Sequence, residues 1–374
     1  MINLQVSPEM LARTVEMAVA IQQIPAPTFS EQKRAEFIRS QFEAEGLCDV
    51  EIDALGNVYG RLPGEQPGPP VVVSAHTDTV FPIDAPLSLK RTQNRLYGAG
   101  IGDNSVGVAG LFALIWMLKQ LPAGSAGRGD VWLAANTGEE GLGDLRGMRA
   151  VVDRFLDSPR AYIILEGLAL GQIYHRGLPV KRYEITIQTK GGHSWVDYGR
   201  PSAIHEVARL INQITQLSLP TRPRTTLNVG LISGGTSVNA LASEAVFKLD
   251  LRSEDNKRLQ ALAGQVEALV QAICRPEVSA TSVQIGNRPG GRIPASHPLV
   301  QLAKRCLMDQ GIHPYLGIGS TDANAPLSRG YPAVCIGLST GGRAHTLDEY
   351  IETGPVPKGL AQLAALVVST FNEL

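Results

Sequence analysis

The stretch PPVVVSAHTDTV, residues 69–80, joins an apolar run to a short polar motif. The uninterrupted apolar residues are typical of a strand that is buried on both faces of an α/β sheet. Just past the end of that strand, His76 and Asp78 stand two residues apart. Open α/β sheets bind ligands at the carboxyl ends of their strands, so a site is expected here. Alone, the motif fits a hydrogen-bonded His–Asp pair as well as half of a metal site.

Segments of the same kind recur outward from this stretch. Helical and apolar extended patterns alternate, which predicts an α/β domain whose helices cover a mostly parallel sheet. Ser7 and Pro8 form a typical helix start, as N-cap and first helical residue. The predicted strands are 47–53, 57–62, 71–75, 130–136, 161–166 and 332–337, and the predicted helices are 7–24, 30–45, 104–121, 146–156, 296–310 and 356–371.

The middle of the chain has a different order of elements. It predicts strand 180–189, helix 201–217, strands 226–233 and 244–252, helix 255–274 and strand 281–286. This β-α-β-β-α-β order is that of a ferredoxin-like unit. Glycine- and proline-rich joints, HRGLP at 175–179 and NRPGGRIP at 287–294, flank it. We therefore expect one domain formed by residues 1–177 and 291–374, interrupted by a second domain of residues 178–290.

Composition excludes several classes of partner. A chain of 374 residues that is 44% hydrophobic can bury a full core, and a net charge of -1 gives no reason to expect nucleic acid or an anionic membrane. The apolar segment 108–121 is too short to span a bilayer and is expected to be a buried core helix. No signal peptide is visible in residues 1–10.

The four cysteines are Cys48, Cys274, Cys306 and Cys335, and they show no CxxC spacing. This pattern favours a reducing compartment, the cytoplasm, over a disulfide framework or a thiolate zinc site.

Asp103 lies in a glycine-rich stretch, YGAGIGDNSVG at 97–107, before a predicted helix. Such a stretch can cradle the phosphates of a dinucleotide. That interpretation fits poorly, because Asp103 occupies the third glycine position and its charge would repel phosphate. The same carboxylate would attract a cation, although an ordinary loop with an acid near a helix start is a further alternative.

Three more acid or histidine positions follow apolar strands. Glu139 and Glu140, in NTGEEGLGD at 136–144, are adjacent carboxylates, which alone would indicate a solvated turn. Near a metal, one could bind the ion while the other takes a proton from water. Glu166 ends the strand 161–166, and His345 lies in the loop after the last predicted strand. Histidine and carboxylate groups gathered at one sheet edge suit zinc, and so many carboxylates favour two ions over one.

The complete series of motifs resembles a known family. HTDTV, GxGxxDN, TGEEGLG, ILEG, GGHS, GSTDAN and AHTLDE occur in the order found in the co-catalytic zinc peptidases and deacylases, which include carboxypeptidase G, peptidase T, succinyl-diaminopimelate desuccinylase, acetylornithine deacetylase and aminoacylase. The resemblance covers essentially the whole chain. It implies a catalytic domain at 1–177 and 291–374 and a lid or dimerisation domain at 178–290.

The resemblance also implies a role for individual residues of the catalytic domain. Asp103 would bridge two divalent ions, with His76 and Glu166 completing one site. Glu140 and His345 would complete the other. Asp78 would stand behind His76, and Glu139 would be the general base. The ions would be Zn²⁺, with Co²⁺ or Mn²⁺ possible at the same ligands.

On the inserted domain, the resemblance implies three residues that act on the substrate. His193 would complete the oxyanion hole, in several members from the partner subunit of a homodimer. Asn239 and Arg252 would hold the substrate. Alternatively, Arg252 pairs with Asp250 or Glu254, and His193 is a surface turn residue. The two joints would act as hinges for lid closure.

Two positions refine these expectations. Many members have a lysine where this chain has Ser105, so the charge around the site differs. A glutamate at the position of Glu166 accompanies carboxypeptidases and deacylases, whereas aspartate accompanies aminopeptidases. The sequence thus favours hydrolysis of a peptide or N-acyl amide bond in a small substrate. A di- or tripeptidase is the alternative, and a non-catalytic binding protein on the same scaffold is a remote one.

Overall fold

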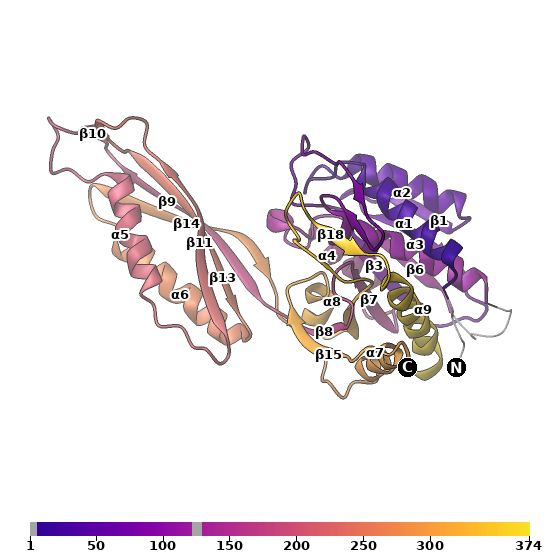
Figure 1. Cartoon of the computed structure of the whole chain (residues 1–374). Coiled ribbons are helices and arrows are strands. Elements are labelled where there is room, and N and C mark those ends of the chain that lie inside the picture. The colour runs from indigo at the N-terminus through magenta and orange to yellow at the C-terminus, as the bar shows by residue number, and fades with distance from the viewer. Residues whose placement is uncertain (1–5, 122–128) are drawn as a thin grey trace. The chain divides into compact units, whose positions relative to one another are not determined.

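The computed structural model describes residues 6–121 and 129–374. The chain divides into two compact units (Figure 1). Unit 1 comprises Met1–Gly177 and Gly291–Leu374, and unit 2 comprises Leu178–Gly290.

Unit 1 is built on an eight-stranded sheet whose four middle strands, β6, β3, β7 and β16, run parallel. Neighbouring parallel strands end at the same edge, so the residues that follow them gather there. The α/β class with a mostly parallel sheet is thereby confirmed. In sheet order the strands are β1 (Cys48–Ile52), β2 (Val58–Leu62), β6 (Val131–Asn136), β3 (Val71–His76), β7 (Ala161–Glu166), β16 (Ala333–Gly337), β8 (Gln172–Gly177) and β15 (Tyr315–Gly319).

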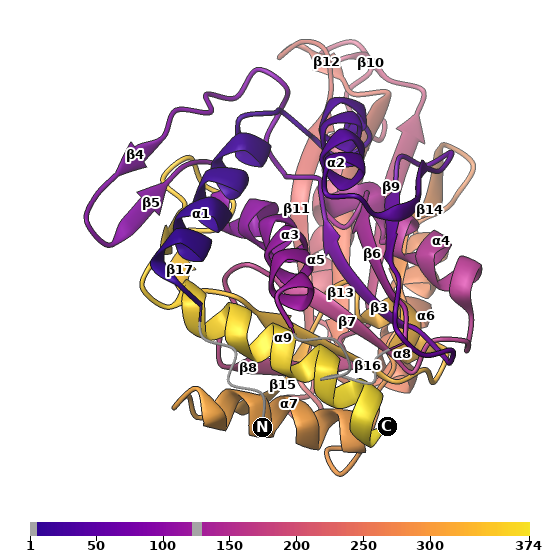
Figure 2. The same cartoon turned by 90° about the vertical axis from the view of Figure 1, so that its right-hand side faces the viewer.

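Helices cover both faces of this sheet (Figure 2). On one face α3 packs on β3 and β7 and against α1 and α9, while α4 packs on β6 and against α8. Ser7 caps α1 by accepting a hydrogen bond from the backbone of Met10, as the sequence predicts. The helices are α1 (Pro8–Gln22), α2 (Gln32–Ala44), α3 (Val106–Lys119), α4 (Arg146–Phe155), α7 (Pro298–Asp309), α8 (Asn324–Ser328) and α9 (Val356–Glu373).

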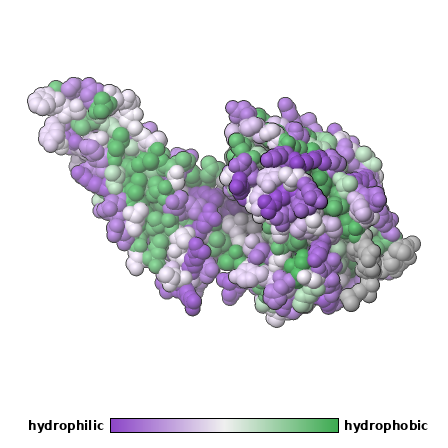
Figure 3. Space-filling view, in the orientation of Figure 1, coloured by the Kyte–Doolittle hydropathy of each residue, from purple (hydrophilic) through white to green (hydrophobic). Residues whose placement is uncertain are grey.

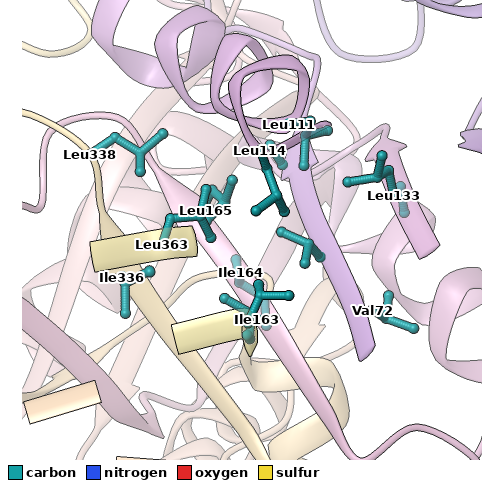
Figure 4. Close-up of a cluster of buried hydrophobic side chains, with 14 of the residues drawn as sticks. Val72, Leu111, Leu114, Leu133, Ile163, Ile164, Leu165, Ile336, Leu338 and Leu363 are labelled. Carbon is teal, nitrogen blue, oxygen red and sulfur yellow. The ribbon is translucent and has the colours of Figure 1, made fainter. Parts of the chain in front are cut away.

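The core lies between α3, α9 and the middle strands. Leu111 and Leu114 of α3 and Leu363 of α9 meet side chains of β3, β7 and β16, and all are essentially inaccessible to solvent (Figure 4). Among the described residues, one helical segment, Ile101–Lys119, is long and apolar enough to cross a membrane, by length and composition alone, and it is almost entirely buried inside the protein. Its burial is that of a core helix.

Unit 2 has its own sheet and core. Its four strands are all antiparallel, in the order β11-β13-β9-β14, and α5 and α6 pack on them. Along β13, buried and more exposed residues alternate, as expected when one face of a sheet is solvated. The elements are β9 (Val180–Thr189), β10 (Gly192–His193), α5 (Ala203–Thr215), β11 (Thr225–Gly234), β12 (Ala240–Leu241), β13 (Glu244–Ser253), α6 (Asn256–Ala272) and β14 (Val278–Arg288).

Apolar residues also lie on the surface of unit 2 (Figure 3). Leu231 and Ile232 on β11 and Val283 on β14 are more than half exposed. β11 is an edge strand of the sheet, so its outer backbone groups have no strand beside them within unit 2.

Several elements differ from the sequence prediction. β8, β15, α8 and a small sheet of four short strands were not predicted: β4 (Lys90–Arg91), β5 (Arg95–Tyr97), β17 (Gly341–Gly342) and β18 (Tyr350–Glu352). The first joint also begins later than its composition suggests. Residues 175–177 end β8, because that strand pairs with both β15 and β16 and so continues to Gly177.

Candidate active site

The ends of the parallel strands bring the acids and histidines of unit 1 together. His76 ends β3, Glu166 ends β7, and Glu139 and Glu140 follow β6. Asp103 lies in the turn Ile101–Ser105 that precedes α3. His345 comes from the loop between β17 and β18.

Asp103 is shared by two groups of side chains that could hold a metal ion. In the first group, His76 Nε2 lies 3.1 Å from Asp103 Oδ1 and 3.8 Å from Glu166 Oε2. In the second group, His345 Nε2 lies 3.1 Å from both Asp103 Oδ2 and Glu140 Oε1. Within each group the candidate ligand atoms lie within 4.8 Å of one another. Each carboxylate oxygen of Asp103 thus faces a different group.

Asp78 is completely buried and forms hydrogen bonds with several parts of the site. Its two carboxylate oxygens accept hydrogen bonds from the backbone N–H groups of Glu139 and Glu140, each at 2.9 Å. The hydroxyl of Thr28 donates to it as well, at 2.8 Å. His76 Nδ1 lies 3.1 Å from the backbone oxygen of Asp78 and 3.5 Å from its Oδ1. Asp78 therefore connects the imidazole of His76 to the loop that carries both glutamates.

Glu349 joins the two loops that carry Asp103 and His345, and it was not identified in the sequence. Its Oε1 accepts from the backbone N–H groups of Gly102 and Asp103, at 2.7 and 2.8 Å. Its Oε2 accepts from the N–H of His345 at 3.4 Å. Burial raises the pKa of Glu349 to about 7. The only signal in the sequence was its place four residues after His345, inside the AHTLDE motif.

Arg34 is a second supporting residue that the sequence did not reveal. The side chain is buried on α2, and its guanidinium donates to the backbone oxygens of Thr77, at 2.6 Å, and Ile24. Burial lowers its pKa to about 10, against the attraction of Asp78 and Glu31. The chain between His76 and Asp78 is thus held by a cation that a helix pattern alone could not place.

The electrostatics of the cluster favour cations. Burial disfavours the charged form of His76, but Asp103, Asp78 and Glu166 outweigh burial and raise its pKa well above the ordinary value. Hydrogen bonds to Asp103 and Glu140 raise the pKa of His345 to about 10. Desolvation opposes ionisation of Asp103, yet the two histidines hold its pKa well below the usual range. Burial raises the pKa of Glu166.

With this geometry in view, we compared the chain with known proteins. The sequence profile of Peptidase family M20/M25/M40 matches residues 72–369. The chain belongs to this family. The match confirms the resemblance drawn from the motifs, and supports a hydrolase of amide bonds.

Individual proteins that are similar to this chain agree with the family assignment. The chain is 30% identical over 243 residues to a Peptidase M20 domain-containing protein of Schizosaccharomyces pombe, covering 61% of this chain and 58% of that one. It is 28% identical over 321 residues to acetylornithine deacetylase of Klebsiella pneumoniae, covering 80% of each. Its fold is similar to that of a tripeptidase from Staphylococcus aureus, with a TM-score of 0.80 and 21% identity over 97% of this chain and 99% of the other.

Ser105 is the position at which the resemblance suggested a lysine in many related proteins. Its side chain is buried, and its hydroxyl donates to the backbone oxygen of Gly100 at 2.6 Å. This bond closes the turn that carries Asp103. Ser105 therefore contributes to the shape of the loop rather than to the charge of the site.

The candidate residues of unit 2 lie in two separate places. His193 and Asn239 are neighbours, because the N–H of Ser194 donates to the backbone oxygen of Asn239 at 3.0 Å. His193 ends the short strand β10 and is exposed, and its Nδ1 accepts from the N–H of Trp195, in the turn that follows, at 3.2 Å.

Arg252 lies near the other end of β13 and pairs with Asp250 at 2.7 Å. β13 has 10 residues, and an extended strand rises about 3.3 Å per residue, so its ends lie roughly 30 Å apart. Arg252 therefore lies toward the opposite end of β13 from the segment that carries Asn239. The ion pair with Asp250 is the alternative that the sequence offered for Arg252.

Proposed function

We propose that this protein is a metal-dependent amidohydrolase of the M20 family that binds two divalent ions, Zn²⁺ first, and cleaves a peptide or N-acyl amide bond in a small substrate. One observation carries the proposal: Asp103 places one carboxylate oxygen toward His76 and Glu166 and the other toward Glu140 and His345. Co²⁺ and Mn²⁺ accept the same ligands.

The donor set fits such ions in both number and kind. Each group offers one imidazole nitrogen and two carboxylates, which zinc accepts as ligands, and three protein ligands are the usual number at a catalytic zinc site that keeps a position open. The raised pKa values of His76 and His345 have the same origin, because crowded carboxylates attract any cation. Glu349 and Asp78 hold the ligand loops through backbone hydrogen bonds, so the groups are oriented before an ion arrives.

Glu139 and Asp78 have different roles in the proposed hydrolysis. When bound, the divalent ions would polarise the scissile carbonyl and make a water molecule more acidic. Glu139 is buried and adjoins Glu140, and its carboxylate is the base that takes the proton from the attacking water. The same carboxyl then gives that proton to the leaving nitrogen. Asp78 keeps the backbone of Glu139 in place during both transfers.

Among small substrates, we favour N-acyl-amino acids and peptides cleaved at the C-terminal amide. Glu166 as a ligand and the identity to acetylornithine deacetylase support this choice. The similar fold of a tripeptidase keeps an aminopeptidase as the second candidate. Zinc-loaded protein tested on matched N-acyl-amino acids and unblocked tripeptides separates the two. Faster turnover of tripeptides would replace the first candidate by the second.

Glu139→Gln tests hydrolysis itself against a non-catalytic binding protein. Removal of a general base lowers kcat about 10²- to 10⁴-fold, whereas the metal ligands are unchanged and the zinc content should stay the same. Asp84→Asn, at an exposed position, is the control. Unchanged hydrolysis by Glu139→Gln, or no hydrolysis of any amide by the zinc-loaded wild type, would contradict the proposal.

We further propose that the protein is a cytoplasmic homodimer joined through unit 2, which acts as a lid without nucleic-acid or membrane partners. The open edge strand β11 with exposed Leu231 and Ile232 supports an interface there. The four free cysteines are compatible with a reducing compartment. Light scattering of the wild type and of Leu231→Glu should give a dimer and a monomer, respectively.

A further inference from the structure

Asp322 is a buried acid near the candidate site to which the proposed chemistry gives no task. It lies between β15 and α8, inside the GSTDAN motif, and no part of it is exposed. Its Oδ2 accepts a hydrogen bond from Asn136 Nδ2 at 2.7 Å. Asn136 is the last residue of β6 and is equally buried.

Each of these two side chains has an oxygen with no hydrogen-bond partner among the described residues. These atoms are Oδ1 of Asp322 and Oδ1 of Asn136, and both are inaccessible to solvent. An ionised Asp322 would have only acceptor atoms, so it could not satisfy the amide oxygen beside it. Two buried acceptors without partners are costly, and an ionised carboxylate with no cation in contact is more so.

A single proton on Asp322 would give both unpaired oxygens a hydrogen-bond partner. A neutral carboxylic acid has one O–H donor, and a primary amide offers a donor and an acceptor next to each other. We propose that Asp322 is protonated at Oδ1 and donates to Asn136 Oδ1, closing a ring of two hydrogen bonds, and that this neutral pair positions the strand ends that carry the active site.

The surroundings of Asp322 favour the proton. The pKa of Asp322 is raised to about 7, with burial as the largest influence: Glu166 and Asp78 act in the same direction, and His76 and the bond from Asn136 oppose them. The thiol of Cys335 on β16 also lies close enough to interact electrostatically with this carboxyl group. Titratable groups thus reach Asp322 from β3, β7 and β16, and most of them are acids. A neutral Asp322 adds no further negative charge to a region that already holds the carboxylates of the candidate site.

The positioning role follows from the backbone of Asn136. Its carbonyl oxygen accepts from both the N–H and the hydroxyl of Thr77, at 2.7 and 3.0 Å. In the parallel register Asn136 also lies opposite His76. The ring between Asp322 and Asn136 therefore connects the segment before α8 to the strand end that bears His76 and to the start of the loop that bears Glu139.

The protonation state is tested by infrared spectroscopy of metal-free protein near pH 6. The difference between wild type and Asp322→Asn should contain the carbonyl stretching band of a protonated carboxylic acid. The matched difference for Asp309→Asn, an exposed acid on α7, should contain only carboxylate bands. If the Asp322 difference shows carboxylate bands instead, the proton is absent and a buried water must join the two oxygens.

The positioning role is tested by zinc affinity, and this half rests on the proposed metal site. An amide at position 322 can keep both bonds of the ring, so Asp322→Asn should hold zinc within about threefold of wild type, whereas Asp322→Ala should bind about 10- to 100-fold more weakly. Equal loss in both variants, or no loss in Asp322→Ala, would overturn the role. Should Asp322→Ala not fold, Asn136→Asp keeps the test open, because two carboxyl groups close the ring only when both are protonated, so zinc affinity relative to wild type should fall as the pH rises. The infrared result needs neither metal nor activity, so its failure is distinct from failure of the proposed function.

Discussion

Glu349 Oε1 lies 2.8 Å from the backbone nitrogen of Asp103, and the two residues are 246 positions apart in the chain. Through this bond and its partner to Gly102, a buried carboxylate determines where the loop of Asp103 lies. The same carboxyl group reaches the backbone of His345, so one side chain controls ligands of the second candidate metal group.

Removing Glu349 should therefore weaken metal binding without touching a ligand. We expect Glu349→Ala to lower zinc affinity about 10- to 100-fold, the usual effect of losing a residue that orients ligands. Glu349→Gln retains the oxygen that accepts two of the three bonds, so its loss should be smaller. Zinc titration with a competing chelator measures both, with Glu352→Gln, near the surface in the same loop region, as the control. Equal affinities for all variants would contradict this role of Glu349.

Asp78 should matter for stability as well as activity. In Asp78→Ala the buried N–H groups of Glu139 and Glu140 lose their acceptor, and each unsatisfied group costs about 1–3 kcal/mol. Urea denaturation should show an unfolding free energy lower by roughly 2–5 kcal/mol. Asp84→Ala, at an exposed position, should change it little. If the unfolding free energy of Asp78→Ala also changes little, these hydrogen bonds are dispensable for stability.

The pH dependence of stability gives a further test of the buried Asp322. Its pKa is raised from 3.8 to about 7 in the folded protein, so folding takes up a proton and loses stability as the pH rises through that interval. Below this interval Asp322 is protonated in both the folded and the unfolded state, so its ionisation does not change stability. Above the interval the loss of stability stays constant. The stability of metal-free Asp322→Asn relative to wild type should accordingly increase between about pH 4 and 7 and then level off. Parallel stability curves would indicate that Asp322 ionises normally.

Mixing two inactive variants tests whether unit 2 works across a dimer. His193→Ala and Glu139→Gln are each expected to be inactive, because one lacks the proposed oxyanion donor and the other the base. If His193 serves the partner subunit, mixed dimers contain one intact site, and we expect activity to return when the two are refolded together. No return after verified subunit exchange would place His193 in its own subunit's reaction or outside the reaction altogether.

The sequence predicted the elements whose own residues determine their structure. The apolar runs at 71–75 and 161–166 are strands because burial on both faces favours them in any neighbouring context. β15, with the sequence YLGIG, was missed because two glycines weaken the pattern and its pairing with β8 supplies the order. The short strands at 341–342 and 350–352 likewise depend on partners elsewhere in the chain.

The residues of the candidate site also fall into two groups: those that a local sequence pattern marks and those that depend on a distant contact. His76, Glu166 and the adjacent glutamates could be found because they come directly after apolar strands. Glu349, Asp322 and Arg34 could not, because each acts through a contact with a distant segment: Glu349 with Gly102, Asp322 with Asn136, and Arg34 with Thr77. No local pattern distinguishes such a residue from an ordinary charged one.

The measurement that tests the central claim most directly is an anomalous difference map from crystals of the zinc-loaded protein. The account predicts two zinc peaks on either side of the Asp103 carboxylate, one contacted by His76 and Glu166 and the other by Glu140 and His345. Zinc bound elsewhere, a single peak that leaves one of the two groups without metal, or no zinc at these residues would contradict it.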